Sequence, residues 1–260
     1  MEVDRALQRE NLGILVKNKG FQFTDSFFPY TSGEIGPYYV NSEVVMANGN
    51  DYARAVNSFA VLITRRFIKD VDVISGGETR DWIFSNPLAY KLGLPHASLY
   101  KDGKMIGANM SGKFVLPVAD LNNEGSSPRD LWIPTIKRAG GTAKEIMFYV
   151  DRLENGVQVM KDLGLISHAV VPLDEVAWEE LREGNVVTEE QYKTLMDRTR
   201  MGKDNWARAM LQSEKGLLQL MSLAGGDEKN KGKARKILEK GYPDLAPELR
   251  TRLFHRGIGI

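Results

Sequence analysis

Apolar residues along the first two thirds of the chain change repeatedly between two spacings, which predicts helices and strands in turn. Apolar positions between residues 4 and 18 recur at loosely helical spacing and predict an amphipathic first helix that ends near Gly20. Residues 21–40 are rich in aromatic and turn residues, which indicates short strands around a polar loop. Further helices are expected over residues 51–68, 82–92, 129–139 and 157–163.

Short β-branched or apolar runs separate these helices, at residues 71–75, 97–100, 113–121 and 145–152. Strands that alternate with helices of about ten residues indicate βαβ units and a mostly parallel sheet. Pro117 is an awkward residue for a central strand of that sheet, because proline lacks a backbone N–H. Ligands of such sheets bind at the carboxyl ends of the strands. The loops after Ser75, Tyr100, Asp120 and Val150 are therefore expected to carry the site.

The pattern beyond about residue 188 is all-helical and polar, with fifteen Lys or Arg against ten Asp or Glu. We therefore predict one domain over residues 1–187 and a helical extension over 188–260, with a flexible link at 225–233. Apolar residues of the extension are expected to pack rather than to bind a cofactor: Leu195, Trp206, Met210 and Leu217. Residues 229–256 carry nine basic and three acidic side chains, but a solvated helical face is favoured over RNA or DNA binding.

Composition narrows the class of protein further. A chain of 260 residues with 42% hydrophobic and 27% charged residues is ordinary for a soluble globular protein, and a net charge of +1 indicates neither nucleic acid nor an anionic membrane. The absence of cysteine excludes disulfides, thiolate zinc sites and cysteine nucleophiles. The charged first residues do not suit a signal peptide, and no apolar run reaches 18 residues, so we expect a cytoplasmic protein without a membrane span.

The most informative loop covers residues 116–128. A strand ends there in a carboxylate, Asp120, and is followed by a polar loop with one glycine, Gly125, and by the start of a helix. Backbone N–H groups at a helix N-terminus suit a phosphate, and a carboxylate accepts hydrogen bonds from ribose hydroxyls. On this pattern alone, plain strand–loop–helix architecture is the more common explanation.

The order of five segments indicates a family. TSGEIGPYYVNSE (31–43), VDVISGGETRDWIFSNPLAYKLGLP (71–95), SLYKDGKMIG (98–107), VADLNNEGSS (118–127) and FYVDRLENG (148–156) follow one another in register. They resemble the early segment, pyrophosphate loop, mobile loop, phosphoribosyl pyrophosphate motif and final core strand of type I phosphoribosyltransferases, with orotate phosphoribosyltransferase the most similar. The resemblance implies that family's α/β fold with a small N-terminal hood, and a homodimer.

The resemblance also implies an activity, in which a phosphoribosyl group passes from phosphoribosyl pyrophosphate to orotate or a related base. The ribosyl carbon becomes oxocarbenium-like as pyrophosphate departs, so the protein chiefly positions substrates and stabilises charge. Mg²⁺ is the implied cofactor, and it prefers diphosphate and hydroxyl oxygens to a full protein cage, so no protein metal site is predicted.

Roles for individual residues follow from their match to the motifs. Lys101 and Lys104 are expected to neutralise the leaving pyrophosphate, and Asp120 to bind the ribose. Substrate-binding roles are expected for Tyr39 on the base, Thr79 and Arg80 in the pyrophosphate loop, Asn123, Gly125, Ser126 and Ser127 around the 5′-phosphate, and Arg152 on the orotate ring. The alternatives are a solvated turn for the lysines, a structural cap for Asp120, core packing for Tyr39, and for Arg152 an ion pair with Asp151 or Glu154.

Several positions depart from the family pattern. Ala119 replaces an acidic residue, Tyr100 an arginine, Thr31 a lysine and Ile106 a histidine, while Asp81 and Trp82 replace a glycine and a small apolar residue. These changes motivate a second hypothesis, a catalytically impaired member that binds a nucleotide or phosphoribosyl ligand in a regulatory or scaffolding role. A third hypothesis is the same reaction on a different base.

Overall fold

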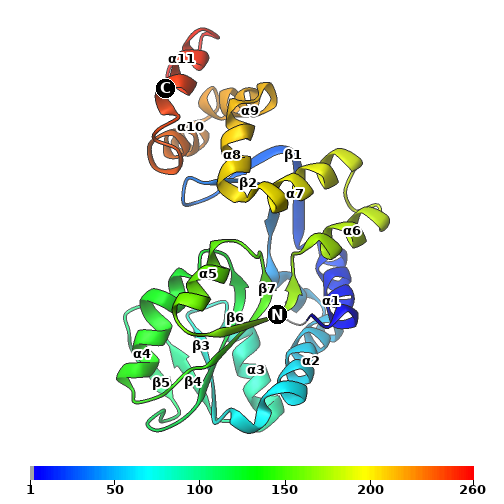
Figure 1. Cartoon of the computed structure of the whole chain (residues 1–260), viewed down its shortest axis with the longest axis vertical. Coiled ribbons are helices and arrows are strands. Elements are labelled where there is room, and N and C mark those ends of the chain that lie inside the picture. The colour runs from blue at the N-terminus through cyan, green and yellow to red at the C-terminus, as the bar shows by residue number, and fades with distance from the viewer. Residues whose placement is uncertain (1–2) are drawn as a thin grey trace. The chain divides into compact units, whose positions relative to one another are not determined.

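The computed structural model describes residues 3–260, and it divides the chain into two compact units (Figure 1). The sheet unit comprises the chain up to Gly20 together with Asn41–Ala177, and the helical unit comprises Phe21–Val40 together with Trp178–Ile260. The expected division placed residues 21–40 in the first domain and a boundary after residue 187. In the structure the strand pair of 21–40 instead packs with the C-terminal helices, and the second change of unit falls at residue 177.

The sheet unit contains a six-stranded, mostly parallel sheet, as the sequence predicted. Its strand order is β5-β4-β3-β6-β7-β8, and only β5 runs antiparallel, to β4. The strands are β3 (Val73–Gly77), β4 (His96–Leu99), β5 (Met105–Gly107), β6 (Val115–Asn122), β7 (Glu145–Asp151) and β8 (Ile166–Pro172). Every residue of β3 is buried, which is the pattern of a strand covered on both faces.

Helices cover both faces of this sheet, with α1, α2 and α3 on one side and α4 and α5 on the other (Figure 1). Side chains of β7 alternate accordingly, because Phe148 joins the core beneath α4 and α5 while Tyr149 stacks on Phe84 of α3. The helical segments of this unit are α1 (Arg5–Lys17), η1 (Ser42–Ala47), α2 (Gly49–Arg66), η2 (Ile68–Asp70), α3 (Trp82–Leu92), η3 (Pro128–Trp132), α4 (Ile133–Arg138) and α5 (Asn155–Asp162).

Two details of the sheet have a local explanation. Pro117 lies inside β6, where the pairing with β3 ends at Ser75↔Pro117 and the pairing with β7 begins only at Val118. The N–H that proline lacks is therefore not needed by either ladder. The segment after Tyr100 was expected to be a loop, but it is the tip of a β4–β5 hairpin in which the Tyr100 N–H donates to the Lys104 carbonyl at 2.9 Å.

The helical unit joins an antiparallel strand pair to the C-terminal helices through one apolar core. Phe27 of β1 and Ile35 of β2 share that core with Trp206, Leu217 and Leu249. The elements are β1 (Phe21–Pro29), β2 (Ile35–Val40), α7 (Glu189–Met201), α8 (Lys203–Gln212), α9 (Glu214–Ala224), α10 (Glu228–Lys236), η4 (Ile237–Gly241) and α11 (Ala246–Phe254), preceded by α6 (Glu175–Glu183), which spans the change of unit. The predicted packing residues are confirmed: Leu195, Trp206 and Leu217 are buried, and Met210 packs on the core.

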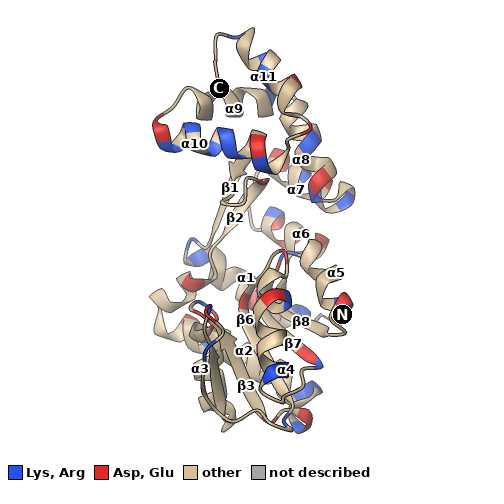
Figure 2. Ribbon diagram, turned by 90° about the vertical axis from the view of Figure 1, so that its left-hand side faces the viewer, with Lys and Arg blue, Asp and Glu red and all other residues tan. Residues whose placement is uncertain are grey.

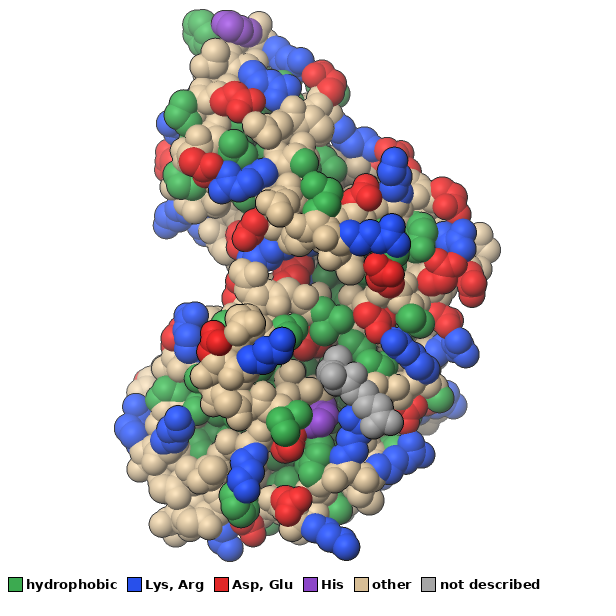
Figure 3. All heavy atoms as spheres, in the orientation of Figure 1, with side chains coloured by type: hydrophobic (Ala, Val, Ile, Leu, Met, Phe, Trp, Pro, Cys, Tyr) green, Lys and Arg blue, Asp and Glu red, His purple; other side chains and the backbone are tan. Residues whose placement is uncertain are grey.

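The flexible link predicted over residues 225–233 is wrong beyond Asp227. The Asp227 side chain accepts a hydrogen bond from the Asn230 N–H and caps α10, which begins at Glu228. The basic residues of α10 form a row on the helix (Figure 2), and Lys231 pairs with Glu228 within it. Charges of both signs are interspersed over the surface seen in Figure 3. Within residues 3–260, none of the helices has the length and apolarity that crossing a bilayer requires.

Candidate functional site

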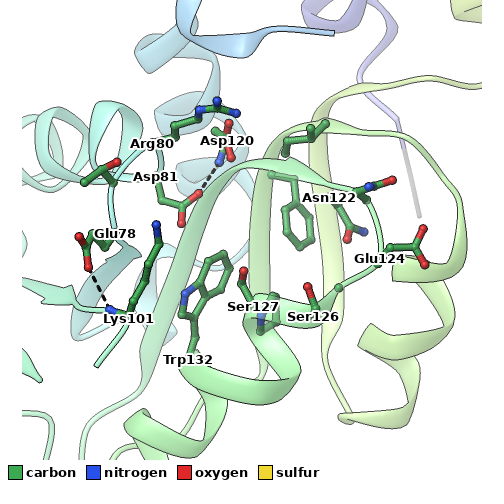
Figure 4. Close-up of a pocket in the computed structure, with 16 residues that line it drawn as sticks. Glu78, Arg80, Asp81, Lys101, Asp120, Asn122, Glu124, Ser126, Ser127 and Trp132 are labelled. Carbon is green, nitrogen blue, oxygen red and sulfur yellow. Dashed lines mark hydrogen bonds between the residues drawn. The ribbon is translucent and has the colours of Figure 1, made fainter. Parts of the chain in front are cut away.

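A pocket of about 420 Å³ lies at the carboxyl ends of the sheet strands, where the sequence placed the site. Residues after β3, after β4 and at the end of β6 form its walls (Figure 4). The lining residues are Glu78, Thr79, Arg80, Asp81, Lys101, Asp120, Leu121, Asn122, Asn123, Glu124, Gly125, Ser126, Ser127, Pro128, Trp132 and Phe148. All of them belong to the sheet unit.

One end of the pocket is the loop Asn123–Ser127, which leads into a continuous helical stretch over residues 126–138. Gly125 has a φ of 67°, and a Cβ there would lie 2.9 Å from both Met160 and Val159, so a side chain is excluded. The first N–H groups of a helix have no partner within it. Together with the hydroxyls of Ser126 and Ser127, which point into the pocket (Figure 4), they offer donors to an anion.

Backbone hydrogen bonds hold this loop and the end of β6 against the segment that follows β7. The Gly156 N–H donates to the Asn123 carbonyl at 2.9 Å, and the Arg152 N–H donates to the Asn122 carbonyl at 3.1 Å. Beneath the loop, the Asn122 side chain donates to the fully buried carboxyl of Asp151 at 3.2 Å. Burial raises the pKa of Asp151 to about 6, although its hydrogen bonds from Leu153 and Asn122 act in the opposite direction.

Asp120 stands between the two ends of the pocket and is held by two neighbours. The hydroxyl of Ser42, in η1, donates to the Asp120 carboxylate at 2.8 Å, and the backbone N–H of Asp120 donates to the Asp81 carboxylate at 2.9 Å. Ser42 is 3% exposed and Asp81 is 6% exposed. Burial, followed by the nearby charge of Asp120, raises the pKa of Asp81 well above its usual range.

The opposite end of the pocket is the loop Glu78–Asp81 that follows β3. Arg80 forms an ion pair with Glu43 at 3.5 Å rather than with Asp81, and the Lys101 backbone N–H donates to the Glu78 carboxylate at 3.0 Å. The Lys101 side chain points into the pocket beside Asp81 (Figure 4). The peptide bond between Glu78 and Thr79 is cis.

The Trp132 ring forms the floor of the pocket, between Lys101 and Ser127 (Figure 4). A Cβ on Gly77 would lie 2.3 Å from its Nε1 atom and 2.7 Å from an Asp81 carboxyl oxygen, so these two side chains cover the end of β3. Ala119 packs in the same apolar cluster as Trp132.

The pocket gathers eight of the residues that the sequence proposed: Thr79, Arg80, Lys101, Asp120, Asn123, Gly125, Ser126 and Ser127. Ser42 and Trp132 were missed: Trp132 lies outside the five segments, and Ser42 lies in the first of them but reaches Asp120 from 78 residues away. Asp81 was noted only as a departure from the pattern, and no sequence signal showed that its side chain would turn inward.

Three proposed residues do not line this pocket. Lys104 lies on the hairpin with its ammonium 5.8 Å from the centre of the Tyr100 ring. Arg152 forms an ion pair with Glu154 at 3.3 Å, and both side chains are less than one tenth exposed, which is one of the structural alternatives foreseen for it. Tyr39 is 41% exposed on β2, in the helical unit.

Comparison with known proteins places the fold. None of the family models searched matches the sequence. A structure of Leishmania donovani UMP synthase has a TM-score of 0.66 and 19% identity, over 75% of this chain but only 42% of that one. An orotate phosphoribosyltransferase from Francisella tularensis has a TM-score of 0.61 and 20% identity, over 73% of this chain and 96% of that one. The orotate phosphoribosyltransferase of Mycobacterium tuberculosis, solved with phosphoribosyl pyrophosphate, has a TM-score of 0.52 and 16% identity over 64% and 96%.

The resemblance that the sequence motifs indicated is confirmed at the level of the fold: the chain has the α/β fold of the type I phosphoribosyltransferases, with orotate phosphoribosyltransferases among its structural neighbours.

Proposed function

We propose that the pocket binds a 5-phosphoribosyl ligand and that the chain is a phosphoribosyltransferase, which transfers this group from phosphoribosyl pyrophosphate to orotate or a related base. One observation carries the proposal: the donor-rich loop Asn123–Ser127 and the Asp120 carboxylate line a single pocket at the carboxyl ends of the strands. A phosphate on the loop places a ribose, one ester bond away, toward Asp120.

The chemistry asks little of the protein beyond position and charge. The bond from the ribosyl carbon to pyrophosphate breaks, a base nitrogen bonds to that carbon, and the base loses its proton to solvent. Lys101 faces the departing pyrophosphate, and Asp120, held by Ser42, accepts hydrogen bonds from the ribose.

Mg²⁺ is proposed to enter with the diphosphate rather than in a protein cage. No group of three or more potential metal ligands is found among the residues that the structure describes, and Mg²⁺ is commonly held by one or two carboxylates plus substrate phosphates. Homodimer formation and a cytoplasmic location stay predictions of the sequence, as do the roles of Lys104, Arg152 and Tyr39.

A second candidate is a binding protein without turnover, and two contacts favour it. Arg152 is tied to Glu154, and Arg80 to Glu43, so two cations expected to hold substrate are paired within the protein. Ala119 also removes one of the two acidic residues of the ribose-binding motif.

Pyrophosphate release from phosphoribosyl pyrophosphate, Mg²⁺ and orotate distinguishes the two candidates. The transferase predicts turnover that falls by at least about tenfold in Asp120→Asn, since the ribose loses a charged acceptor. Binding of phosphoribosyl pyrophosphate or ribose 5-phosphate without turnover supports the second candidate. If no phosphoribosyl ligand binds, both are overturned. A panel of purine and pyrimidine bases in the same assay identifies a different acceptor.

A further inference from the structure

We propose that the pocket selects ligands with a single 5′-phosphate, such as a nucleoside monophosphate or ribose 5-phosphate, over phosphoribosyl pyrophosphate, and that Asp81 sets this selectivity. The inference rests on the proposed phosphoribosyl site, which both candidate functions share. It assigns unequal roles to the two ends of the pocket.

The Asp81 carboxyl already uses the backbone donors at the pyrophosphate end. It accepts a hydrogen bond from the Asp120 N–H at 2.9 Å and another from the Gly77 N–H. Backbone N–H groups that converge at the end of a strand are the donors that a phosphate would take. In this chain an internal side chain occupies them, and because Asp81 is 6% exposed it is not displaced by a simple rotation into solvent.

Space at that end is also filled. Trp132 and Asp81 fill the space beside Gly77, with atoms 2.3 and 2.7 Å from the position of an added Cβ. Glycine often allows a phosphate to approach the backbone closely, and here two side chains of the protein take that place.

Charge at the pyrophosphate end is unfavourable as well. Two cations, Arg80 and Lys101, face three carboxyl groups, Glu78, Asp81 and Asp120. Arg80 is shared with a fourth, Glu43. Even with Asp81 protonated, the remaining charges do not offset the several negative charges of a pyrophosphate group.

The 5′-phosphate end lacks these obstacles. The loop Asn123–Ser127 offers helix N-terminal N–H groups and two hydroxyls, and its single acidic residue, Glu124, accepts a hydrogen bond from Asn155 at 3.1 Å. One phosphate therefore finds open donors, whereas the pyrophosphate of the larger ligand does not.

Calorimetric titration of ribose 5-phosphate and phosphoribosyl pyrophosphate, each with and without Mg²⁺, tests the proposal. The wild type is expected to bind ribose 5-phosphate at least about tenfold more tightly. Asp81→Gly frees both N–H donors and should raise the affinity for phosphoribosyl pyrophosphate by about tenfold, with ribose 5-phosphate changed by less than about threefold. Asp81 makes no side-chain cap on α3, so glycine removes no cap there.

Asp81→Asn is the intermediate variant: the amide keeps the volume of the side chain but only one acceptor oxygen, so it should raise the affinity for phosphoribosyl pyrophosphate by less than Asp81→Gly does. Asp81→Ser, which also frees the donors, replaces Asp81→Gly if thermal denaturation shows that the glycine variant is unfolded. Equal or tighter wild-type binding of phosphoribosyl pyrophosphate overturns the selectivity but leaves the phosphoribosyl site standing. No binding of either ligand overturns the site itself, and an unchanged preference in Asp81→Gly and Asp81→Ser overturns the role of Asp81.

Discussion

The two ends of the pocket are built from the same kind of element, a loop between a strand and a helix, yet they differ in what they leave open. The loop Asn123–Ser127 turns its N–H groups and hydroxyls toward the pocket and bends its acidic side chain toward Asn155. The loop Glu78–Asp81 turns a carboxyl inward, and this carboxyl accepts hydrogen bonds from the N–H groups of Asp120 and Gly77 on the adjoining strands. Two loops in the same fold can therefore differ in the hydrogen-bond donors that they leave for a ligand, because a single side chain such as Asp81 can occupy them.

Gly125→Ala is expected to have the largest effect on ligand binding, because the added methyl group displaces the loop Asn123–Ser127. The new Cβ meets Met160 and Val159 at 2.9 Å, so the loop must shift and ribose 5-phosphate affinity should fall by at least about thirtyfold, roughly 2 kcal/mol. Gly164→Ala is the control, since Gly164 has a similar φ of 72° but nothing within 4 Å. Calorimetry and urea unfolding measure both. Equal binding by the two variants would contradict the role of the Gly125 loop.

The buried carboxyl beneath the open end makes stability depend on pH. The pKa of Asp151 is about 6 in the folded protein, which is above its value in the unfolded chain. Its contribution to the free energy of unfolding is therefore full below about pH 4 and is lost as the pH rises through 6. The free energy of unfolding falls by about 3 kcal/mol at most over this range. Urea unfolding between pH 4 and 7 should show a smaller decline of the unfolding free energy with rising pH in Asp151→Asn than in the wild type. Parallel pH profiles would show that Asp151 does not titrate in this range.

The two lysines of the β4–β5 hairpin, Lys101 and Lys104, allow a comparison between a cation that lines the pocket and one that does not. Lys101 points into the pocket, so Lys101→Ala should weaken binding of phosphoribosyl pyrophosphate by about tenfold, and binding of ribose 5-phosphate less. Lys104→Ala removes the same charge from a side chain that does not line the pocket, and should change either affinity by less than about twofold. The motif alone proposed both lysines; the reverse order in calorimetric titrations would mean that Lys104, rather than Lys101, contacts the ligand.

The last prediction concerns Ser42, whose hydroxyl holds Asp120 between the two ends of the pocket. Ser42→Ala removes the hydrogen bond to Asp120 and should weaken ribose 5-phosphate binding by about threefold to tenfold, on the order of 1 kcal/mol. Ser58→Ala is the control variant. Ser58, in α2, is also buried and forms hydrogen bonds with Arg54 and Asn11, but it does not line the pocket. Urea unfolding should show a lower free energy of unfolding for both variants, but only Ser42→Ala should bind ribose 5-phosphate more weakly. If both variants bind it more weakly, the loss of affinity would follow from reduced stability and not from the hydrogen bond to Asp120.

The sequence predicted the parallel sheet and the edge that carries the pocket from the alternation of strands and helices. Eight of the pocket's residues were predicted through the resemblance of local motifs to those of the type I phosphoribosyltransferases. It did not predict that Ser42 would orient Asp120, because this contact joins segments 78 residues apart in the chain. The strand pair of 21–40 was placed with the wrong neighbours for the same reason: its apolar residues, Phe27 and Ile35, match a core supplied by helices beyond residue 200.

A crystal structure of the protein with ribose 5-phosphate would show which end of the pocket holds the phosphate. The phosphate is expected against the backbone of Gly125–Ser127, with the ribose hydroxyls toward Asp120 and the Asp81 carboxyl still hydrogen-bonded to the Asp120 N–H. A phosphate bound instead at Glu78–Asp81, with Asp81 turned away, would contradict this expectation.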